Sequence, residues 1–211
     1  MNIDDQKQIF EKVYEGINGS AISHRGRAEM NSDDTRHLIY GEFSFEELGR
    51  TFTQPGIEEK ILSCRTFGDL GSGTGRIAIG MSLLFPHFSK IIGVELVKAL
   101  SETSNLVKQK YEAIDEQGAN KIKFVNDNFF NVDFSPKHLD LDVIFMHYPM
   151  VNAEDLYLNL EDKMRKELKS GAVIVSAIRT LVDLDSFPEI APPCKINCYY
   201  GGATMHYHKK V

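Results

Sequence analysis

The sequence predicts a doubly wound α/β fold whose mostly parallel sheet ends in an antiparallel hairpin. Short apolar segments alternate with amphipathic ones from about residue 67 to residue 178, a pattern typical of parallel strands joined by helices. The glycine-rich segment LGSGTGR (70–76) follows the first of these strands. Gly201-Gly202 separates two short segments near the C-terminus, and such a pair indicates a hairpin.

The region before these strands differs in character. Within residues 3–18, apolar side chains recur near helical spacing, which predicts an amphipathic helix that ends at Gly19. Residues 19–37 are polar and show no period, so they predict a long loop. We expect residues 1–37 to form a helix and loop that belong to a lid, and residues 38–211 to form one domain around a single core.

The remaining elements follow in chain order. We expect a strand that ends at Asp69, a helix over 75–84, strands over 91–95, 121–126, 141–147 and 172–178, helices over 97–114 and 153–168, and hairpin strands over 195–200 and 203–209.

Composition limits the classes of function. A formal charge of −6 disfavours nucleic acid as the main partner. No run reaches the roughly 18 apolar residues of a membrane span, and the start MNIDDQKQIF has no basic region, so we expect a cytoplasmic protein. The three cysteines lack zinc-site spacing, and His206 and His208 would supply only two ligands on one strand face, so no metal site is predicted.

The glycine loop predicts a ligand site. Gly71, Gly73 and Gly75 lie where a strand turns into a helix, and such a turn can hold a nucleotide-like ligand against backbone N–H groups. Arg76 stands where the dinucleotide fingerprint requires glycine. Glu95 ends the next strand, and an acid there can bind both hydroxyls of a ribose. Together these residues predict a cofactor that contains adenosine.

Two motifs resemble a known family. DLGSGTGR (69–76) and GVE (93–95) resemble the S-adenosylmethionine site of class I methyltransferases, which implies a Rossmann-like, seven-stranded sheet. LIYGEFSF (38–45) resembles the Y-G-E-x-S-F segment of the disruptor-of-telomeric-silencing family, non-SET lysine methyltransferases that modify a histone core. The resemblance extends from residue 38 to about residue 177. Lysine methyltransferases of the ATP synthase c-subunit type share the D-L-G-S-G-x-G-R loop.

The resemblance implies cofactor contacts from a lid, from the glycine loop and from the strand ends that follow. The implied residues are Tyr40, Glu42, Asp69, Gly71, Ser72, Gly73, Gly75, Glu95, Leu96, Asp127, Asn128 and Phe129. In this set Tyr40, Glu42 and Asp69 would hold the methionine moiety. Glu95 would bind the ribose, and Asp127 or Asn128 would bind the adenine amino group with Phe129 against the ring.

A second set is expected to line the acceptor channel. A lysine amine must arrive uncharged, and an aromatic channel lowers its pKa by desolvating the ammonium form. The candidates are Phe43, His147, Tyr148, Tyr200 and Tyr207. The family has asparagine where His147 stands and threonine where Phe43 stands. Tyr200 and Tyr207 have the spacing of two aromatic residues that wall the family's lysine channel, although hairpin packing also explains such a pair.

These observations support three hypotheses. The first is an S-adenosylmethionine-dependent protein-lysine methyltransferase, with a histone-type protein among its possible partners. The second keeps the cofactor and changes the acceptor to a small molecule or an rRNA base. The third is a cofactor-binding interaction module without turnover.

Overall fold

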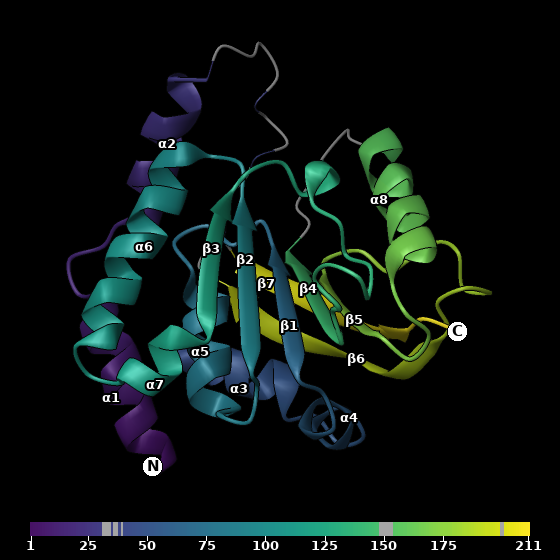
Figure 1. Ribbon diagram of the computed structural model, residues 1–211, viewed down its shortest axis with the longest axis horizontal. Helices are drawn as coiled ribbons and strands as arrows, with labels where there is room; N and C mark the ends of the chain where they lie inside the picture. Colours follow the sequence, from purple (N-terminus) through teal and green to yellow (C-terminus); the bar gives the residue numbers. More distant parts are fainter. Residues whose placement is uncertain (31–34, 36–37, 39, 148–153, 199–200) are drawn as a thin grey trace.

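The structure is a computed structural model that describes residues 1–30, 35, 38, 40–147, 154–198 and 201–211. It contains one seven-stranded sheet of order β3-β2-β1-β4-β5-β7-β6 (Figure 1). The strands are β1 (Thr66–Leu70), β2 (Lys90–Glu95), β3 (Ile122–Asn126), β4 (Val143–His147), β5 (Val173–Ala177), β6 (Glu189–Cys198) and β7 (Gly201–Lys209). Strands β1 to β5 pair in parallel, and β7 is antiparallel to both of its neighbours. The predicted fold class is confirmed.

Helices cover both faces of the sheet. They are α1 (Ile3–Tyr14), α2 (Gly19–Ala28), α3 (Phe45–Phe52), α4 (Glu58–Leu62), α5 (Arg76–Leu84), α6 (Lys98–Glu112), α7 (Glu116–Asn120) and α8 (Glu154–Glu167), with a short 3-10 helix, η1 (Phe129–Asn131). The core on one face contains side chains of α1, α3, α5 and α6. The core on the other face contains side chains of α8. The sheet is therefore the middle of three layers.

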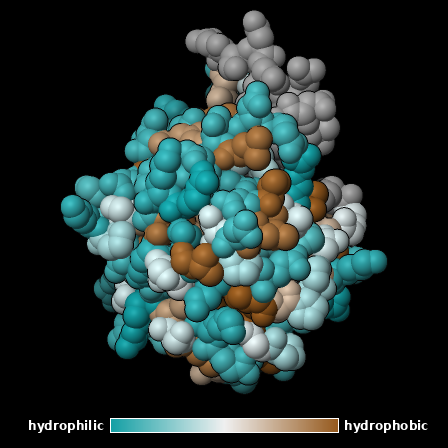
Figure 2. Space-filling view, turned by 90° about the vertical axis from the view of Figure 1, so that its right-hand side faces the viewer, coloured by the Kyte–Doolittle hydropathy of each residue, from teal (hydrophilic) through white to brown (hydrophobic). Residues whose placement is uncertain are grey.

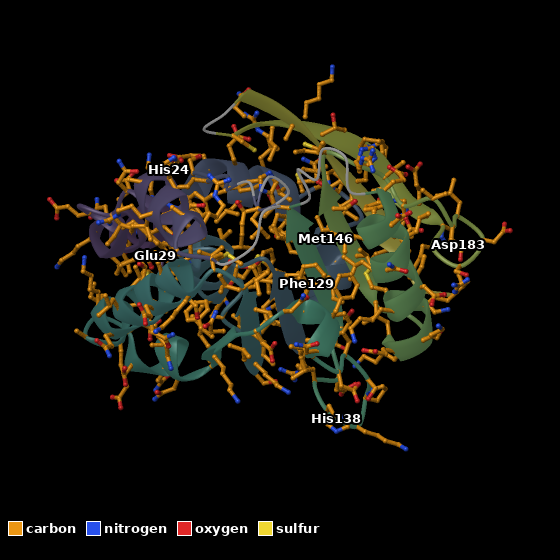
Figure 3. All side chains as sticks on the ribbon, turned by 90° about the horizontal axis from the view of Figure 1, so that it is seen from above. His24, Glu29, Phe129, His138, Met146 and Asp183 are labelled. Atoms are coloured by element: carbon orange, nitrogen blue, oxygen red, sulfur yellow. The ribbon has the colours of Figure 1, made fainter. Side chains whose placement is uncertain are left out.

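Strand pairing brings the carboxyl ends of β1, β2 and β4 to one edge of the sheet. Leu70 of β1 is in register with Val94 of β2 and with Met146 of β4. The strand order reverses between β1 and β4, and ligands of such sheets bind beyond the carboxyl ends of the strands at this reversal. A view onto that edge shows Met146 and Phe129 near the middle, between the segments that carry His24 and Asp183 (Figure 3).

The loop predicted over 19–37 is wrong for its first part, because residues 19–28 form α2. The side chain of Asn18 caps this helix by accepting a hydrogen bond from the N–H of Ala21 at 2.9 Å. Its buried residues are Gly19, Ser23 and Gly26, which recur at helical spacing but are small. Gly19 lies against Tyr40 and Glu42, and Gly26 lies against Val97 and Ala99. A hydrophobic-periodicity argument cannot detect such a face.

The C-terminal hairpin is confirmed, although β6 begins at Glu189, before the predicted start. Its register with β7 shifts between Ala191 and Cys194, around Pro192 and Pro193. Proline cannot donate a ladder hydrogen bond, and β6 tolerates two of them because it is an edge strand with a bulge.

Within the described part of the chain, none of the helices is both long and apolar enough to span a membrane. The side of the molecule that carries α8 is mainly hydrophilic, with small separate apolar areas (Figure 2).

Candidate active site

The glycine loop between β1 and α5 has left-handed backbone at three positions. Gly71, Gly73 and Gly75 have φ values of 83°, 55° and 83°, a region that residues with a Cβ rarely adopt. The N–H groups of Gly71 and Ser72 donate to the carbonyl oxygen of Val94 at 2.8 and 3.0 Å. The loop is thereby tied to the carboxyl end of β2.

Two buried carboxyl groups flank the loop. Glu95 accepts hydrogen bonds from the N–H of Gly73 at 2.8 Å and from the N–H of Val97 at 2.7 Å. Asp69 is 1% exposed, and its Oδ2 atom has no hydrogen-bond partner. Burial, and next the nearby Glu95, raises the pKa of Asp69 well above its ordinary value, and burial also raises the pKa of Glu95. An unpartnered buried acceptor of this kind is suited to a cationic ligand group.

Tyr40, one of the residues expected to contact the methionine moiety, lies over the loop. A Cβ on Gly73 would lie 2.4 Å from Cε2 of Tyr40, so the tyrosine ring rests directly on that glycine. The Tyr40 hydroxyl donates to Oε1 of Glu42 at 2.9 Å and lies 2.7 Å from Oγ1 of Thr74. Glu42 in turn pairs with Arg76, with 3.4 Å between Oε2 and the guanidinium.

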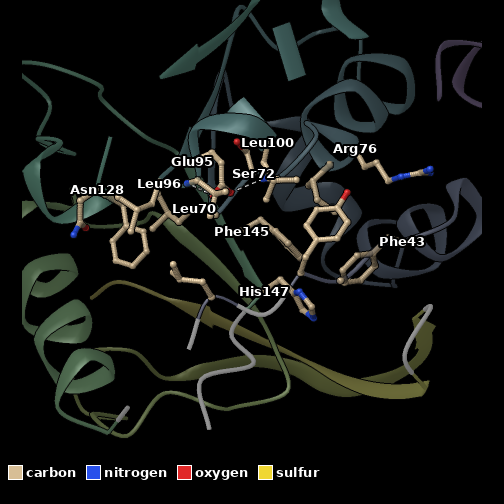
Figure 4. A pocket seen from close by; sticks show the side chains of 18 of the residues that line it. Phe43, Leu70, Ser72, Arg76, Glu95, Leu96, Leu100, Asn128, Phe145 and His147 are labelled. Atoms are coloured by element: carbon tan, nitrogen blue, oxygen red, sulfur yellow. Dashed lines mark hydrogen bonds between the residues drawn. The ribbon is translucent and has the colours of Figure 1, made fainter. Parts of the chain in front are cut away.

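These elements enclose a pocket at the carboxyl edge of the sheet (Figure 4). At one end lie Leu96, Asn128, Phe129 and Phe130, which offer flat apolar surface beside a polar amide. The Asn128 side chain accepts a hydrogen bond from the N–H of Phe130 at 3.0 Å. This contact uses its oxygen.

Aromatic rings form the opposite end of the pocket, where Figure 4 shows Phe43, Phe145 and His147 together. Phe43 meets Phe145 and His147 edge-on, with ring centroids 5.6 and 5.3 Å apart. Burial lowers the pKa of His147 to about 4. At neutral pH this wall is therefore uncharged.

Ten of the residues expected from the sequence line the pocket: Tyr40, Phe43, Gly71, Ser72, Gly73, Glu95, Leu96, Asn128, Phe129 and His147. Glu42, Asp69, Gly75 and Asp127 do not line it. Glu42 faces Arg76 instead, and Asp127 accepts hydrogen bonds from the N–H of Asn128 and from the amide of Asn131. Tyr148 and Tyr200 lie outside the described residues.

Tyr207 is not part of the pocket, which corrects the expectation for this residue. Its side chain is fully buried under α3, and its hydroxyl donates to the carbonyl oxygen of Thr51 at 2.9 Å. The pairing of Tyr207 with Val175 of β5 decides this position, because it places the ring within the apolar core layer.

The pocket also contains residues that were not expected from the sequence. They are Leu38, Gly41, Leu70, Arg76, Ile77, Val97, Leu100, Phe130, Phe145 and Leu156. Most are apolar, and the sequence pattern assigns such residues to the core. Phe145 lies two residues before His147 on β4, so strand periodicity places both on one face and would have identified it.

The hydrogen-bond acceptors beside the glycine loop fit S-adenosylmethionine. Asp69 does not line the pocket, but its buried, unpartnered Oδ2 can accept a hydrogen bond from an ammonium group through a water, and the Glu95 carboxylate lines the pocket beside the glycine loop. Gly71 would meet no protein atom within 4 Å of an added Cβ, which leaves room for a ligand on that side. Among the described residues, no group of three metal-ligating side chains is present.

A family model described as histone methylation protein DOT1 matches residues 29–186. A search of curated proteins gives no match. Among solved structures, magnesium protoporphyrin IX methyltransferase ChlM from Synechocystis PCC 6803 has a TM-score of 0.62 at 10% identity, over 98% of this chain and 97% of that chain. TrmN from Thermus thermophilus has a TM-score of 0.54 at 16% identity, over 79% of this chain and 48% of that chain. The TM-scores above 0.5 show that these proteins share the fold of this chain, and at such low sequence identities the likeness concerns the fold alone.

Proposed function

This chain belongs to the family of histone methylation protein DOT1 and is an S-adenosylmethionine-dependent methyltransferase, and from that premise we propose that its acceptor is the side-chain amine of a protein lysine. The observation that carries the proposal is the uncharged aromatic wall of Phe43, Phe145 and His147 at one end of the pocket. The family's description as a histone methylation protein supports a lysine-rich protein as the partner.

The chemistry sets what this wall must do. S-adenosylmethionine, when bound, supplies a methyl group on a sulfonium sulfur that an in-line nucleophile can take. Only the neutral amine has the required lone pair, and burial among apolar rings disfavours the ammonium form. The flanking methylene groups of a lysine would pack against Phe43 and Phe145. His147 is neutral at physiological pH, so it adds no charge that would repel a residual ammonium group.

The same pocket supports a proposal for the cofactor contacts. Asp69 and Glu95 would hold the methionine amino group and the ribose, because they are the buried carboxyl groups beside the glycine loop. Asn128 and Phe129 would contact the adenine at the other end of the pocket. A cofactor bound in this order would have its methyl group nearest to the aromatic wall.

The test combines the purified chain, S-adenosylmethionine with a radiolabelled methyl group, and purified core histones or a whole-cell extract. We expect label in protein, recovered as methyl-lysine after acid hydrolysis. A labelled nucleic acid base or metabolite, with no labelled lysine, would replace this proposal with the small-acceptor hypothesis. Binding of the cofactor with no labelled product in either mixture would instead favour the interaction module.

Two phenylalanine variants test whether methyl transfer depends on the aromatic wall. Phe43→Leu should lower the rate of transfer at least about tenfold, or about 1.4 kcal/mol, while the dissociation constant of S-adenosylmethionine changes by less than about threefold. The matched control is Phe134→Leu, since Phe134 is equally buried but lies in the other core layer and does not line the pocket. Equal rates for the two variants would exclude a role for the wall.

A further inference from the structure

Arg76 occupies an unusual position at the first residue of α5. Its guanidinium carbon lies 4.3 Å from the ring centroid of Tyr14 and 5.6 Å from that of Phe10, both on α1. The same guanidinium pairs with Glu42. Figure 4 shows the side chain extending away from Glu95 and Asn128. A planar cation between aromatic rings and a carboxylate is held in one orientation.

Through Glu42, Arg76 also fixes the position of Tyr40, which lies over the glycine loop. Glu42 uses its second oxygen, Oε1, to accept the hydrogen bond of the Tyr40 hydroxyl at 2.9 Å. Tyr40 also bonds to Thr74 and rests on Gly73. Arg76, Glu42 and Tyr40 therefore form one chain of contacts from α1 to the loop.

The two N-terminal helices complete this arrangement. The Tyr14 hydroxyl donates to the carbonyl oxygen of Thr74 at 3.2 Å, which ties α1 to the same loop. An added Cβ on Gly19 of α2 would lie 2.3 Å from Oε1 of Glu42, so the start of α2 packs directly against that carboxylate. Both helices precede the residues matched by the family model.

We propose that Arg76 is a positioning residue that, braced by Tyr14 and Phe10 of α1, holds Glu42 and through it Tyr40 against the glycine loop, so that the N-terminal helices complete the cofactor pocket. Tyr14 and Glu42 do not line the pocket themselves, and they act on cofactor affinity through Arg76 and Tyr40. This role concerns the cofactor alone and is independent of the identity of the methyl acceptor.

A double-mutant cycle tests the proposal through the dissociation constant of S-adenosylmethionine, measured by calorimetry without any acceptor. We expect Arg76→Met and Glu42→Gln each to weaken binding about tenfold, because each leaves a charged partner unpaired. The double variant should bind more tightly than either single variant, since the introduced glutamine can still accept the Tyr40 hydrogen bond with no charge left unpaired.

Because Arg76 also lines the pocket, the cycle must separate positioning from direct contact with the cofactor. Direct contact predicts additive losses in the double variant, or unchanged to tighter binding by Glu42→Gln, and either result overturns the proposal. Arg50→Met is the control, since the exposed Arg50 of α3 pairs with Glu47 at 3.6 Å and neither residue lines the pocket, so affinity should be unchanged.

Two further measurements guard against a merely structural effect. Hydrogen exchange of the cofactor-free chain should speed up at residues 40–43 in Arg76→Met and return toward the wild-type rate in the double variant. Tyr14→Phe keeps the ring beneath Arg76 and should retain affinity within about threefold, whereas Tyr14→Leu removes that ring and should lose about as much affinity as Arg76→Met. Equal affinities for Tyr14→Leu and Tyr14→Phe, with both chains folded by circular dichroism, would show that the stack on α1 plays no part.

Discussion

Glu95 accepts a hydrogen bond from the backbone N–H of Gly73 at 2.8 Å, so the acid at the end of β2 supports the loop as well as facing the pocket. Its other oxygen accepts from the N–H of Val97 at 2.7 Å. The same carboxylate thus fixes both the glycine loop and the residue that precedes α6. A residue of this kind affects stability and ligand binding together.

Replacing Glu95 should therefore reduce both properties. In Glu95→Ala both N–H groups lose their acceptor, and we expect the free energy of unfolding to fall by about 1–3 kcal/mol for each. Glu95→Gln keeps one acceptor oxygen and should be less destabilised. Denaturant unfolding and calorimetry with S-adenosylmethionine provide the two measurements. Unchanged stability of Glu95→Ala would mean that the loop does not depend on this carboxylate.

Replacing Asp69 should raise stability and lower cofactor binding, whereas replacing Glu95 should lower both. Burial and then Glu95 raise its pKa, so the folded chain binds this proton more tightly than the unfolded chain does. The carboxyl group therefore destabilises the fold at neutral pH, and stability recovers as the pH falls through the raised folded-state pKa toward the ordinary value.

Asp69→Asn removes that penalty. We expect the cofactor-free variant to unfold at a higher temperature than the wild type at neutral pH, with roughly 2–4 °C for each kcal/mol gained in a chain of this size. Its affinity for S-adenosylmethionine should fall, because the charged partner for the amino group is lost. Thermal scans between mildly acidic and neutral pH check both the gain and its disappearance in acid. A variant that is less stable at neutral pH and equally good at binding would contradict the assignment.

Gly73→Ala should affect the pocket beyond backbone strain. The left-handed φ of 55° costs about 1–2 kcal/mol for a residue with a Cβ, and the new methyl group would displace the Tyr40 ring. Gly56→Ala is the matched control, because Gly56 has a φ of 79° with no atom within 4 Å of an added Cβ. Both variants should lose stability, and only Gly73→Ala should lose cofactor affinity. Equal affinities would show that the glycine is required only for the turn.

Tyr207 should behave as a core residue. Tyr207→Phe removes the hydrogen bond to the Thr51 carbonyl oxygen and should lower the free energy of unfolding by about 1 kcal/mol. Cofactor affinity and the rate of methyl transfer, measured on the same preparation, should match the wild type. A large loss of transfer at wild-type stability would restore the expected place of Tyr207 in an acceptor channel.

The sequence by itself determined the parallel region and the position of the ligand-binding edge. Apolar runs alternating with helices allow few arrangements other than a parallel sheet, and the carboxyl ends of its strands share one edge. The glycines at 71, 73 and 75 and the acid at 95 could therefore be placed together from their order alone. The positive φ values confirm why glycine stands at all three loop positions.

Only the tertiary structure decided which side chains reach the pocket and which lie behind it. Alternation along a strand shows which residues share a face of the sheet, but it does not show which face a helix covers. From the sequence, Tyr207 could therefore be assigned either to the channel or to the core. Glu42 turned toward Arg76 because α1 places two aromatic rings beneath that guanidinium, and these rings are distant in sequence. The asparagine cap of helix α2 is a local contact, but its small residues Gly19 and Gly26 lie against Tyr40, Glu42, Val97 and Ala99. Those contacts exist only once the neighbouring segments are in place.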